Sequence, residues 1–246
     1  MSEPDWAGLW RELVERSGRP DKAGEALERG KEKRPDLLLD FMLEKLQAAD
    51  TLLDIGAGSG RYAVPFARKV KTVTAIEPSP ARAAVLRENG IQVIEGRWED
   101  ATVAPHDVAF CSHAMYTSAD LVAFVRKMER HARTLRCLVM RMPAHDGVLG
   151  ELSRRIYGHP HDSPNFWIGY HVLYEMGIYA HVVMEPAVRR WTDESLDAAM
   201  SRARRHLQLE DGSRDALIRE TLARRLTVQD GNYCWPDGMR SALVWW

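Results

Sequence analysis

Short apolar runs alternate with helix-like segments along the middle of the 246-residue chain, and this alternation restricts the possible folds more than any other feature. Val, Ile and Leu dominate the runs, as is typical of buried strands. Because strand, helix, strand alternation needs crossover connections, it predicts a mostly parallel sheet with helices on both faces. The predicted strands are Leu52–Ile55, Thr72–Ile76, Ile91–Ile94, Asp107–Phe110 and Cys137–Met142. The sequence therefore predicts a doubly wound α/β fold.

A helical pattern comes before this alternating region. From Trp6 to Gln47, apolar residues recur at three- and four-residue spacing, which is typical of amphipathic helices. Trp6 and Trp10 follow this spacing, and we expect both indoles to face the core. The segment therefore predicts an N-terminal helical cap within residues 1–50.

The segment after Met142 predicts further elements, beginning with a loop. The Gly, His and Pro content from Pro143 to about Tyr170 is typical of a loop. The elements expected after it are a helix at His171–Met176, a strand at Ile178–Met184, Arg-rich helices at Asp193–Leu207 and Ser213–Leu226, and a last strand at Ser241–Trp246. Asp and Glu lie near the arginines, so we expect a solvated, charge-paired face there. We expect a single domain (1–246) with the cap, a core (51–142) and this C-terminal part (143–246).

The charge balance and the cysteines limit the possible partners and compartments. The 34 basic and 35 acidic residues nearly cancel, and the isoelectric point of about 6.8 gives no global field that would attract nucleic acid or anionic lipid. No run of about 18 apolar residues is present, so we expect no membrane span. Cys111, Cys137 and Cys234 are widely spaced and odd in number, which favours reduced thiols. We expect a cytoplasmic protein, either a monomer or a homodimer.

The most specific motif is a three-glycine loop, Gly56-Ala57-Gly58-Ser59-Gly60, which directly follows the first predicted strand. Glycines are needed where a chain turns sharply and lets a ligand approach the bare backbone. The spacing G-x-G-x-G differs from the G-x-G-x-x-G of dinucleotide-binding loops. Asp54 precedes the loop and can order its amides and face an amino group, but its carboxylate would repel a pyrophosphate. The motif therefore disfavours an NAD-dependent oxidoreductase.

An acidic residue ends the second predicted strand. Glu77 lies 17 positions after Gly60, where a carboxylate can accept hydrogen bonds from both hydroxyls of an adenosine ribose. Ser79 and Pro80 then suit the cap and first turn of a helix. The glycine loop alone is a weak signal, but the loop, Asp54 and Glu77 in register predict an adenosine-containing ligand.

These motifs resemble those of the class I, Rossmann-like S-adenosylmethionine-dependent methyltransferases, over roughly Thr51 to Met142. Leu52–Arg61 is similar to the family's first motif, and Glu77 to its ribose-binding acid. The resemblance implies a seven-stranded, mostly parallel sheet with an antiparallel C-terminal strand and a helical insertion before it. It implies an enzyme that uses S-adenosylmethionine, and the near-neutral charge together with the lack of an added RNA-binding module favours a small-molecule acceptor. The implied cofactor-binding residues are Asp54, Gly56, Ala57, Gly58, Gly60, Glu77, Pro78, Arg97, Trp98, Glu99, Ser112 and His113, although the family usually has a small residue where Trp98 stands.

The resemblance also implies where an acceptor and a general base lie. Methyl transfer is an in-line displacement, so positioning dominates and a base is needed only for some acceptors. His113 follows the fourth predicted strand and is our first candidate for the base, with His145, Asp146 and His171 as alternatives. The loop from Pro143 is then a substrate loop. Our candidates for substrate-binding residues are Tyr116, His145 and Tyr170.

Other functions stay open at this point. The Arg-rich helices can instead contact RNA or a protein substrate, and a non-catalytic cofactor-binding subunit that needs a partner is a further alternative. Cys111 lacks the preceding proline of pyrimidine-attacking cysteines, which disfavours a cysteine nucleophile. His159, His161 and Asp162 are close in sequence, but this loop offers no convincing further ligand, so we expect no metal.

Overall fold

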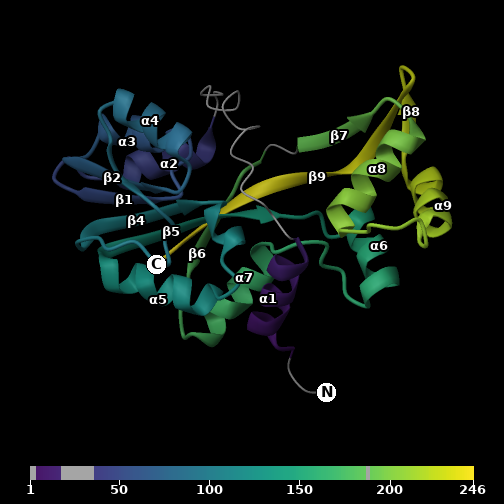
Figure 1. Cartoon of the computed structure of the whole chain (residues 1–246), viewed down its shortest axis with the longest axis horizontal. Coiled ribbons are helices and arrows are strands. Elements are labelled where there is room, and N and C mark those ends of the chain that lie inside the picture. The colour runs from purple at the N-terminus through teal and green to yellow at the C-terminus, as the bar shows by residue number, and fades with distance from the viewer. Residues whose placement is uncertain (1–3, 18–35, 187–188) are drawn as a thin grey trace.

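The computed structural model describes residues 4–17, 36–186 and 189–246. Across this part of the chain, the central sheet has the strand order β3-β2-β1-β4-β5-β9-β6 (Figure 1). β1 to β5 are parallel to their neighbours, whereas β9 is antiparallel to both β5 and β6. The strands are β1 (Thr51–Ile55), β2 (Thr72–Glu77), β3 (Gln92–Glu95), β4 (His106–Ser112), β5 (Ala132–Met142), β6 (His181–Met184) and β9 (Asn232–Trp245). The predicted doubly wound α/β fold with an antiparallel C-terminal strand is confirmed.

Helices cover both faces of this sheet, as Figure 1 shows. One face carries α2, α3 and α4, whose apolar cluster includes Leu39 and Phe66. The other face carries α1, α5 and α7, whose cluster includes Trp10 and Phe124. The bounds are α1 (Trp6–Ser17), α2 (Leu37–Lys45), α3 (Ala63–Ala67), α4 (Pro80–Glu88), α5 (Leu121–His131) and α7 (Phe166–Glu175). None of the described helices combines the length and apolar character needed to cross a membrane.

The parallel register brings the carboxyl ends of three neighbouring strands to one edge of the sheet. Ile55, at the end of β1, pairs with Ile76 of β2 and with Cys111 of β4. The loops that follow β1, β2 and β4 therefore emerge side by side. In open α/β sheets, ligands bind at this edge where the strand order reverses.

The N-terminal helix α1 packs across α5 and α7. Trp10 is fully buried, and its indole N–H donates to the carbonyl of Ser118 at 3.0 Å. The Trp6 indole stacks on His171 of α7, with ring centroids 4.2 Å apart. The expectation that both tryptophans pack toward the core is confirmed. The part of the predicted cap at residues 18–35 lies outside the described residues.

A second, smaller sheet forms on the first half of β9. β7 (Arg189–Asp193) and β8 (Thr227–Gln229) pair antiparallel with it. Figure 1 shows α6 (Val148–Tyr157), α8 (Leu196–Leu207) and α9 (Asp215–Arg225) gathered beside this sheet. These elements share their own buried cluster, which includes Leu152, Leu222 and Trp235. We call residues 148–157 and 189–240 the lobe; its helices α8 and α9 are the predicted helical insertion.

Two sequence predictions for the C-terminal part are wrong. The segment predicted as a loop from Pro143 to Tyr170 contains α6 and the start of α7. Val148 and Leu152 bury an apolar face of α6 against α8 and α9. The surrounding Gly, His and Pro residues obscure this apolar pattern in the sequence. The last strand begins at Asn232 rather than at Ser241, because β7 and β8 supply hydrogen-bonding partners for its first half.

Candidate functional site

The three-glycine loop follows β1 in a conformation that its glycines make possible. Gly56 has φ +72° and Gly58 has φ +59°, values that residues with a Cβ adopt at a cost. A Cβ on Gly56 would lie 2.2 Å from the Cβ of Ala114, in the loop after β4. A Cβ on Gly58 would meet nothing within 4 Å. Gly56 therefore allows two loops to approach each other, whereas Gly58 borders open space where a ligand can approach the backbone.

Glu77, at the end of β2, ties this loop to the start of α4. Its Oε2 accepts a hydrogen bond from the Gly58 amide at 2.8 Å, and its Oε1 accepts one from the Ser79 amide at 2.9 Å. The Arg82 guanidinium lies 3.9 Å from the same Oε1. The carboxylate is buried, with only 2% of the residue exposed. Glu77 therefore sits at the tip of β2 in direct contact with the glycine loop, as its sequence position predicts.

Asp54 is a buried carboxyl with unused hydrogen-bonding capacity. It lies in β1 and is 2% exposed, and its Oδ2 has no hydrogen-bond partner among the described residues. Burial, together with the nearby charge of Glu77, raises the pKa of Asp54 to about 8. A buried polar atom without a partner is uncommon and calls for an explanation. A cation that reached Oδ2 would favour the ionised form of this carboxyl.

The raised pKa of Asp54 predicts that this group stabilises the fold less as pH rises, which is the opposite of the usual effect of a carboxyl group. Because the native pKa of about 8 exceeds the unfolded value near 3.8, the folded state binds the proton more tightly. The free energy of unfolding should therefore fall as pH rises from about 4 to about 8, by at most about 1.4 kcal/mol per pH unit from this group. Asp54→Asn should remove this contribution, which urea unfolding between pH 5 and pH 9 measures.

Asp107→Asn provides the matched control for this measurement. Asp107 lies at the opposite end of the sheet, where hydrogen bonds from the Thr51 amide and hydroxyl hold the pKa of that carboxyl below its usual value. Its stabilising effect is present above that usual value and is lost as pH falls through the lowered one, so its removal should leave the slope between pH 5 and pH 8 unchanged. An unchanged slope in Asp54→Asn would contradict the assignment.

The turn after β3 carries the residues that the family resemblance places along an adenine. Arg97 and Glu99 are exposed, whereas Trp98 is buried at 4% exposure. The Trp98 indole N–H donates to the Phe124 carbonyl of α5 at 3.2 Å, and Lys127 Nζ donates to three carbonyls of this turn. The indole thus fastens the turn to α5, and its contact with an adenine stays a prediction.

His113 lies at the carboxyl end of β4, where the sequence predicts it. Its amide donates to the Val139 carbonyl at 3.0 Å, and its side chain is exposed. Its φ of 60° is uncommon for a residue with a side chain, and such strain is often found at functional sites. Ala114, the next residue, is the one that Gly56 approaches. His113 is therefore held beside the glycine loop.

Other groups near the end of β4 are buried or hydrogen-bonded within the protein. Burial raises the pKa of the Cys111 thiol, which agrees with the expectation that Cys111 is not a nucleophile. The side chain of Ser112 is hydrogen-bonded to Tyr62, and burial raises the pKa of Tyr62 to about 12. Tyr116 is 5% exposed, and its hydroxyl accepts a hydrogen bond from the Arg141 amide.

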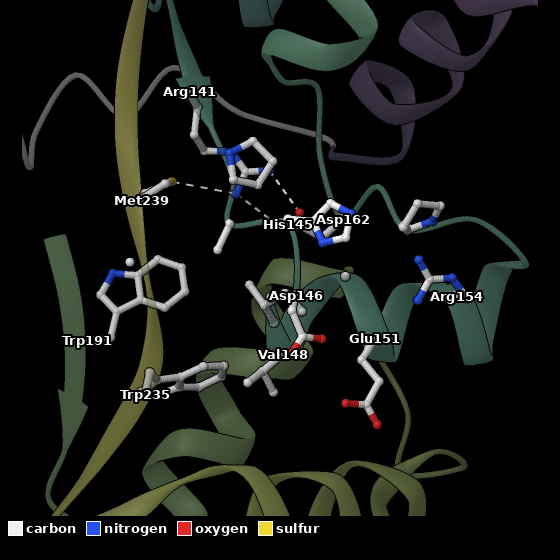
Figure 2. Close-up of a pocket in the computed structure, with 17 residues that line it drawn as sticks. Arg141, His145, Asp146, Val148, Glu151, Arg154, Asp162, Trp191, Trp235 and Met239 are labelled. Carbon is white, nitrogen blue, oxygen red and sulfur yellow. Dashed lines mark hydrogen bonds and ion pairs between the residues drawn. The ribbon is translucent and has the colours of Figure 1, made fainter. Parts of the chain in front are cut away.

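The predicted substrate residues separate into two places. His145 lines a cavity beyond the end of β5 (Figure 2), and Tyr116 contacts the Arg141 backbone at the edge of that cavity. Tyr170 lies elsewhere, because its hydroxyl donates to the Ala180 carbonyl at 3.0 Å and it does not line the cavity. His171 stacks on Trp6 and is therefore occupied in helix packing. The structure therefore places His145 in the cavity lining and Tyr170 outside it.

The cavity contains residues that the sequence did not indicate. Trp191 and Trp235 form one wall in Figure 2, and Arg154 lies on the other side. The two tryptophans come from β7 and β9, whose pairing no local pattern predicts. Trp191 and Arg154 could therefore not have been selected without the tertiary structure.

The histidine-rich segment after α6 has a packing role. Within the described residues, no group of three or more His, Cys, Asp or Glu side chains could hold a metal ion. Burial, together with the neighbouring His159, lowers the pKa of His161 to about 4. His161 packs edge-on against Trp6, and His159 Nε2 lies 3.7 Å from a carboxylate oxygen of Glu12. This segment therefore joins α1 to the end of α6.

The chain is similar in sequence to one protein family and in fold to several solved structures. Residues 53–135 match the family model described as a methyltransferase domain, and no curated protein matches the chain in sequence. The YcgJ protein from Bacillus subtilis has a TM-score of 0.53 and 18% identity, over 84% of this chain and 96% of that one. A SAM-dependent methyltransferase from Thiobacillus denitrificans, in complex with S-adenosyl-L-homocysteine, has a TM-score of 0.53 and 13% identity, over 100% of this chain and 98% of that one. Geranyl diphosphate methyltransferase in complex with SAM has a TM-score of 0.50 and 14% identity, over 85% of this chain and 83% of that one.

The strand order, the three-glycine loop and the acid at the tip of β2 define a class I, Rossmann-like methyltransferase fold. At these identities the solved structures bear on the fold alone. The family model adds the sequence evidence, because it covers the core from β1 into β5. The chain therefore has a class I methyltransferase fold, and its core matches a methyltransferase-domain model, as the sequence resemblance implies.

Proposed function

We propose that this protein binds S-adenosylmethionine at the carboxyl ends of β1, β2 and β4 and transfers its methyl group to a small-molecule acceptor. The observation that carries the proposal is the buried Asp54 carboxyl, whose Oδ2 lacks a partner in the described chain, next to a loop with open space at Gly58. A buried carboxylate is costly unless it is paired, and the ammonium group of the cofactor is a suitable partner. Two proteins of similar fold were solved with SAM or S-adenosyl-L-homocysteine bound, which supports the same ligand here.

The chain offers polar groups for each part of this cofactor. An ionised carboxylate can accept about four hydrogen bonds, and that of Glu77 accepts two from backbone amides, so capacity is left for both ribose hydroxyls. Gly58 leaves room for close approach to the loop backbone. Arg97 and Glu99 flank the expected adenine position after β3. Further contacts are proposed for Gly56, Ala57, Gly60, Pro78, Trp98, Ser112 and His113.

Positioning is the main task of the protein in this reaction. Bound S-adenosylmethionine supplies a methyl group on a sulfonium, which is a good leaving group. Holding the acceptor in line with that methyl group can lower the barrier by roughly 7–11 kcal/mol. His113 is the proposed general base, because it is exposed beside the glycine loop on a backbone fixed by Val139. It would add roughly 10²–10⁴-fold for an acceptor that must lose a proton, such as a hydroxyl.

The charge distribution of the lobe supports a small-molecule acceptor rather than RNA. Five arginines of α8 and α9 form ion pairs with acids of the same chain. The pairs are Arg202–Asp193, Arg204–Asp215, Arg219–Asp197, Arg224–Glu151 and Arg225–Asp146. Paired arginines attract phosphates less strongly than free ones, so these helices form a weaker nucleic-acid surface than their composition suggests.

Calorimetric titration with S-adenosylhomocysteine tests the cofactor assignment. We expect micromolar binding of S-adenosylhomocysteine and no binding of NAD, because the glycine spacing of the loop differs from that of dinucleotide-binding loops. Folded protein that binds neither S-adenosylhomocysteine nor S-adenosylmethionine would refute the proposal. Transfer of a radiolabelled methyl group to a metabolite extract then tests turnover. Turnover by a monomer would exclude the alternative of a non-catalytic subunit.

A further inference from the structure

The cavity that His145 lines lies between the end of β5, α6 and the second sheet (Figure 2). Its volume is about 70 Å³, and it is partly open to solvent. Trp191 and Trp235 meet edge to face with ring centroids 5.5 Å apart, and Val148 lies beside them in Figure 2. Pro143 and Met239 extend this apolar lining. The walls therefore suit a flat, apolar group.

The acids that line the cavity already have cationic partners. Asp162 accepts two hydrogen bonds from the Arg141 guanidinium, at 2.9 and 3.1 Å. Although burial raises the pKa of Asp162, this guanidinium holds it below its usual value. Asp146 and Glu151 lie 3.2 and 2.8 Å from guanidinium nitrogens of Arg225. The acids of the lining are thus neutralised by the protein itself.

The unmet hydrogen-bonding groups of the cavity are donors. The Arg154 guanidinium lines the cavity, is exposed, and has no acidic partner in the described part of the chain. Arg141 Nε is buried and has no acceptor among the described residues. Figure 2 places Arg154 across the cavity from the tryptophan pair. An exposed guanidinium with no acidic partner and a buried Nε with no acceptor among the described residues, beside acids that are already paired, favour a ligand with anionic oxygens.

The cavity adjoins the edge where we place methyl transfer. Arg141, which lines the cavity, donates its amide to the hydroxyl of Tyr116. The Tyr116 ring lies 5.8 Å from the ring of His113, between centroids. One layer of side chains therefore separates the cavity wall from the proposed base.

We propose that this cavity binds the methyl acceptor, and that the acceptor is a small organic carboxylate with a flat, apolar body about one ring in size. Its role as acceptor rests on the function proposed above. The carboxylate pairs with Arg154, and the flat body lies against Trp191 and Trp235. The cavity volume is about half of the ~150 Å³ that holds a benzene ring, so a ring bound there would leave part of its body in the open mouth.

Three carboxylates of increasing length test this assignment in the absence of cofactor. Benzoate, phenylacetate and 3-phenylpropanoate are titrated into the protein by calorimetry, each beside its uncharged primary amide. At least one carboxylate should bind, and its amide should bind at least fivefold more weakly, because the amide cannot form the charge-assisted pair with a guanidinium. Arg154→Gln should weaken carboxylate binding at least fivefold and leave amide binding unchanged.

Arg155→Gln is the matched control, since Arg155 is the exposed neighbour on α6 whose guanidinium faces Thr221 and Glu220 instead of the cavity. It should bind the carboxylates as wild type does. The proposal is overturned if no carboxylate binds, if amides bind as well as carboxylates, or if both arginine variants behave alike. Binding of S-adenosylhomocysteine is measured on the same samples. If the protein binds carboxylates in an Arg154-dependent way but does not bind S-adenosylhomocysteine, only the proposed function is refuted. If it binds S-adenosylhomocysteine but no carboxylate, only the acceptor class is refuted.

Discussion

Glu77→Ala is expected to weaken binding of S-adenosylhomocysteine by at least about tenfold, which corresponds to about 1.4 kcal/mol. The carboxylate is 2% exposed at the tip of β2, so its hydrogen bonds to ribose hydroxyls would form away from water. Its removal also leaves the Gly58 and Ser79 amides without their acceptor. Loss of a charged acceptor typically costs more than loss of a neutral one. Calorimetric titration of wild type and variant measures the change.

Glu95→Ala is the matched control for this substitution. Glu95 pairs with Glu77 in the register of β3 and β2, but its side chain is 42% exposed and forms an ion pair with Arg87. Its removal should leave binding within about twofold of wild type, because exposed ion pairs contribute little. Equal effects of the two substitutions would show that the acid at the tip of β2 has no specific role. Glu77→Gln should fall between wild type and Glu77→Ala, because its amide keeps one acceptor oxygen.

Two alanine substitutions in the glycine loop should differ in their effects: one should mainly lower fold stability, and the other should mainly weaken cofactor binding. Gly56→Ala should destabilise the fold by about 2–5 kcal/mol, because positive φ costs about 1–2 kcal/mol and overpacking about 1–3 kcal/mol. The added Cβ would lie 2.2 Å from the Cβ of Ala114. Gly58→Ala should lose only about 1–2 kcal/mol of stability, since its Cβ meets no protein atom within 4 Å, but it should weaken cofactor binding more than tenfold. Urea unfolding and calorimetry on the same samples separate the two effects.

Gly90→Ala is the control that measures only the loss of stability caused by a Cβ at positive φ. Gly90 follows α4 with φ +75°, and a Cβ there would also meet nothing within 4 Å. It should lose stability as Gly58→Ala does and retain cofactor binding. If Gly58→Ala retained full affinity, the open space at that glycine would not be the place where the ligand approaches the loop.

The core of the site could be predicted because its signals are local in sequence. Asp54 and the glycine loop are adjacent along the chain, and a strand followed by a glycine loop and a helix fixes where their groups lie. Glu77 follows one crossover later, so parallel pairing of β1 with β2 brings it to the same edge. His113 ends β4 for the same reason. Neither Tyr170 nor His171 follows this rule, because each lies on a helix whose rotation is set by packing, and α7 turns them toward Ala180 and Trp6.

The sequence by itself determined the order of strands β1 to β5 and the helices between them, the edge of the sheet that carries the site and the residues that line its glycine loop. Hydrophobic periodicity and glycine spacing are local properties, and short crossover connections leave few arrangements for them. Only the tertiary structure decided the lobe and its cavity. Arg154, Trp191 and Trp235 come from segments that meet because β7 pairs with the first half of β9 and α6 packs beside them. Such long-range pairing depends on which buried faces fit together, and no single segment encodes that fit.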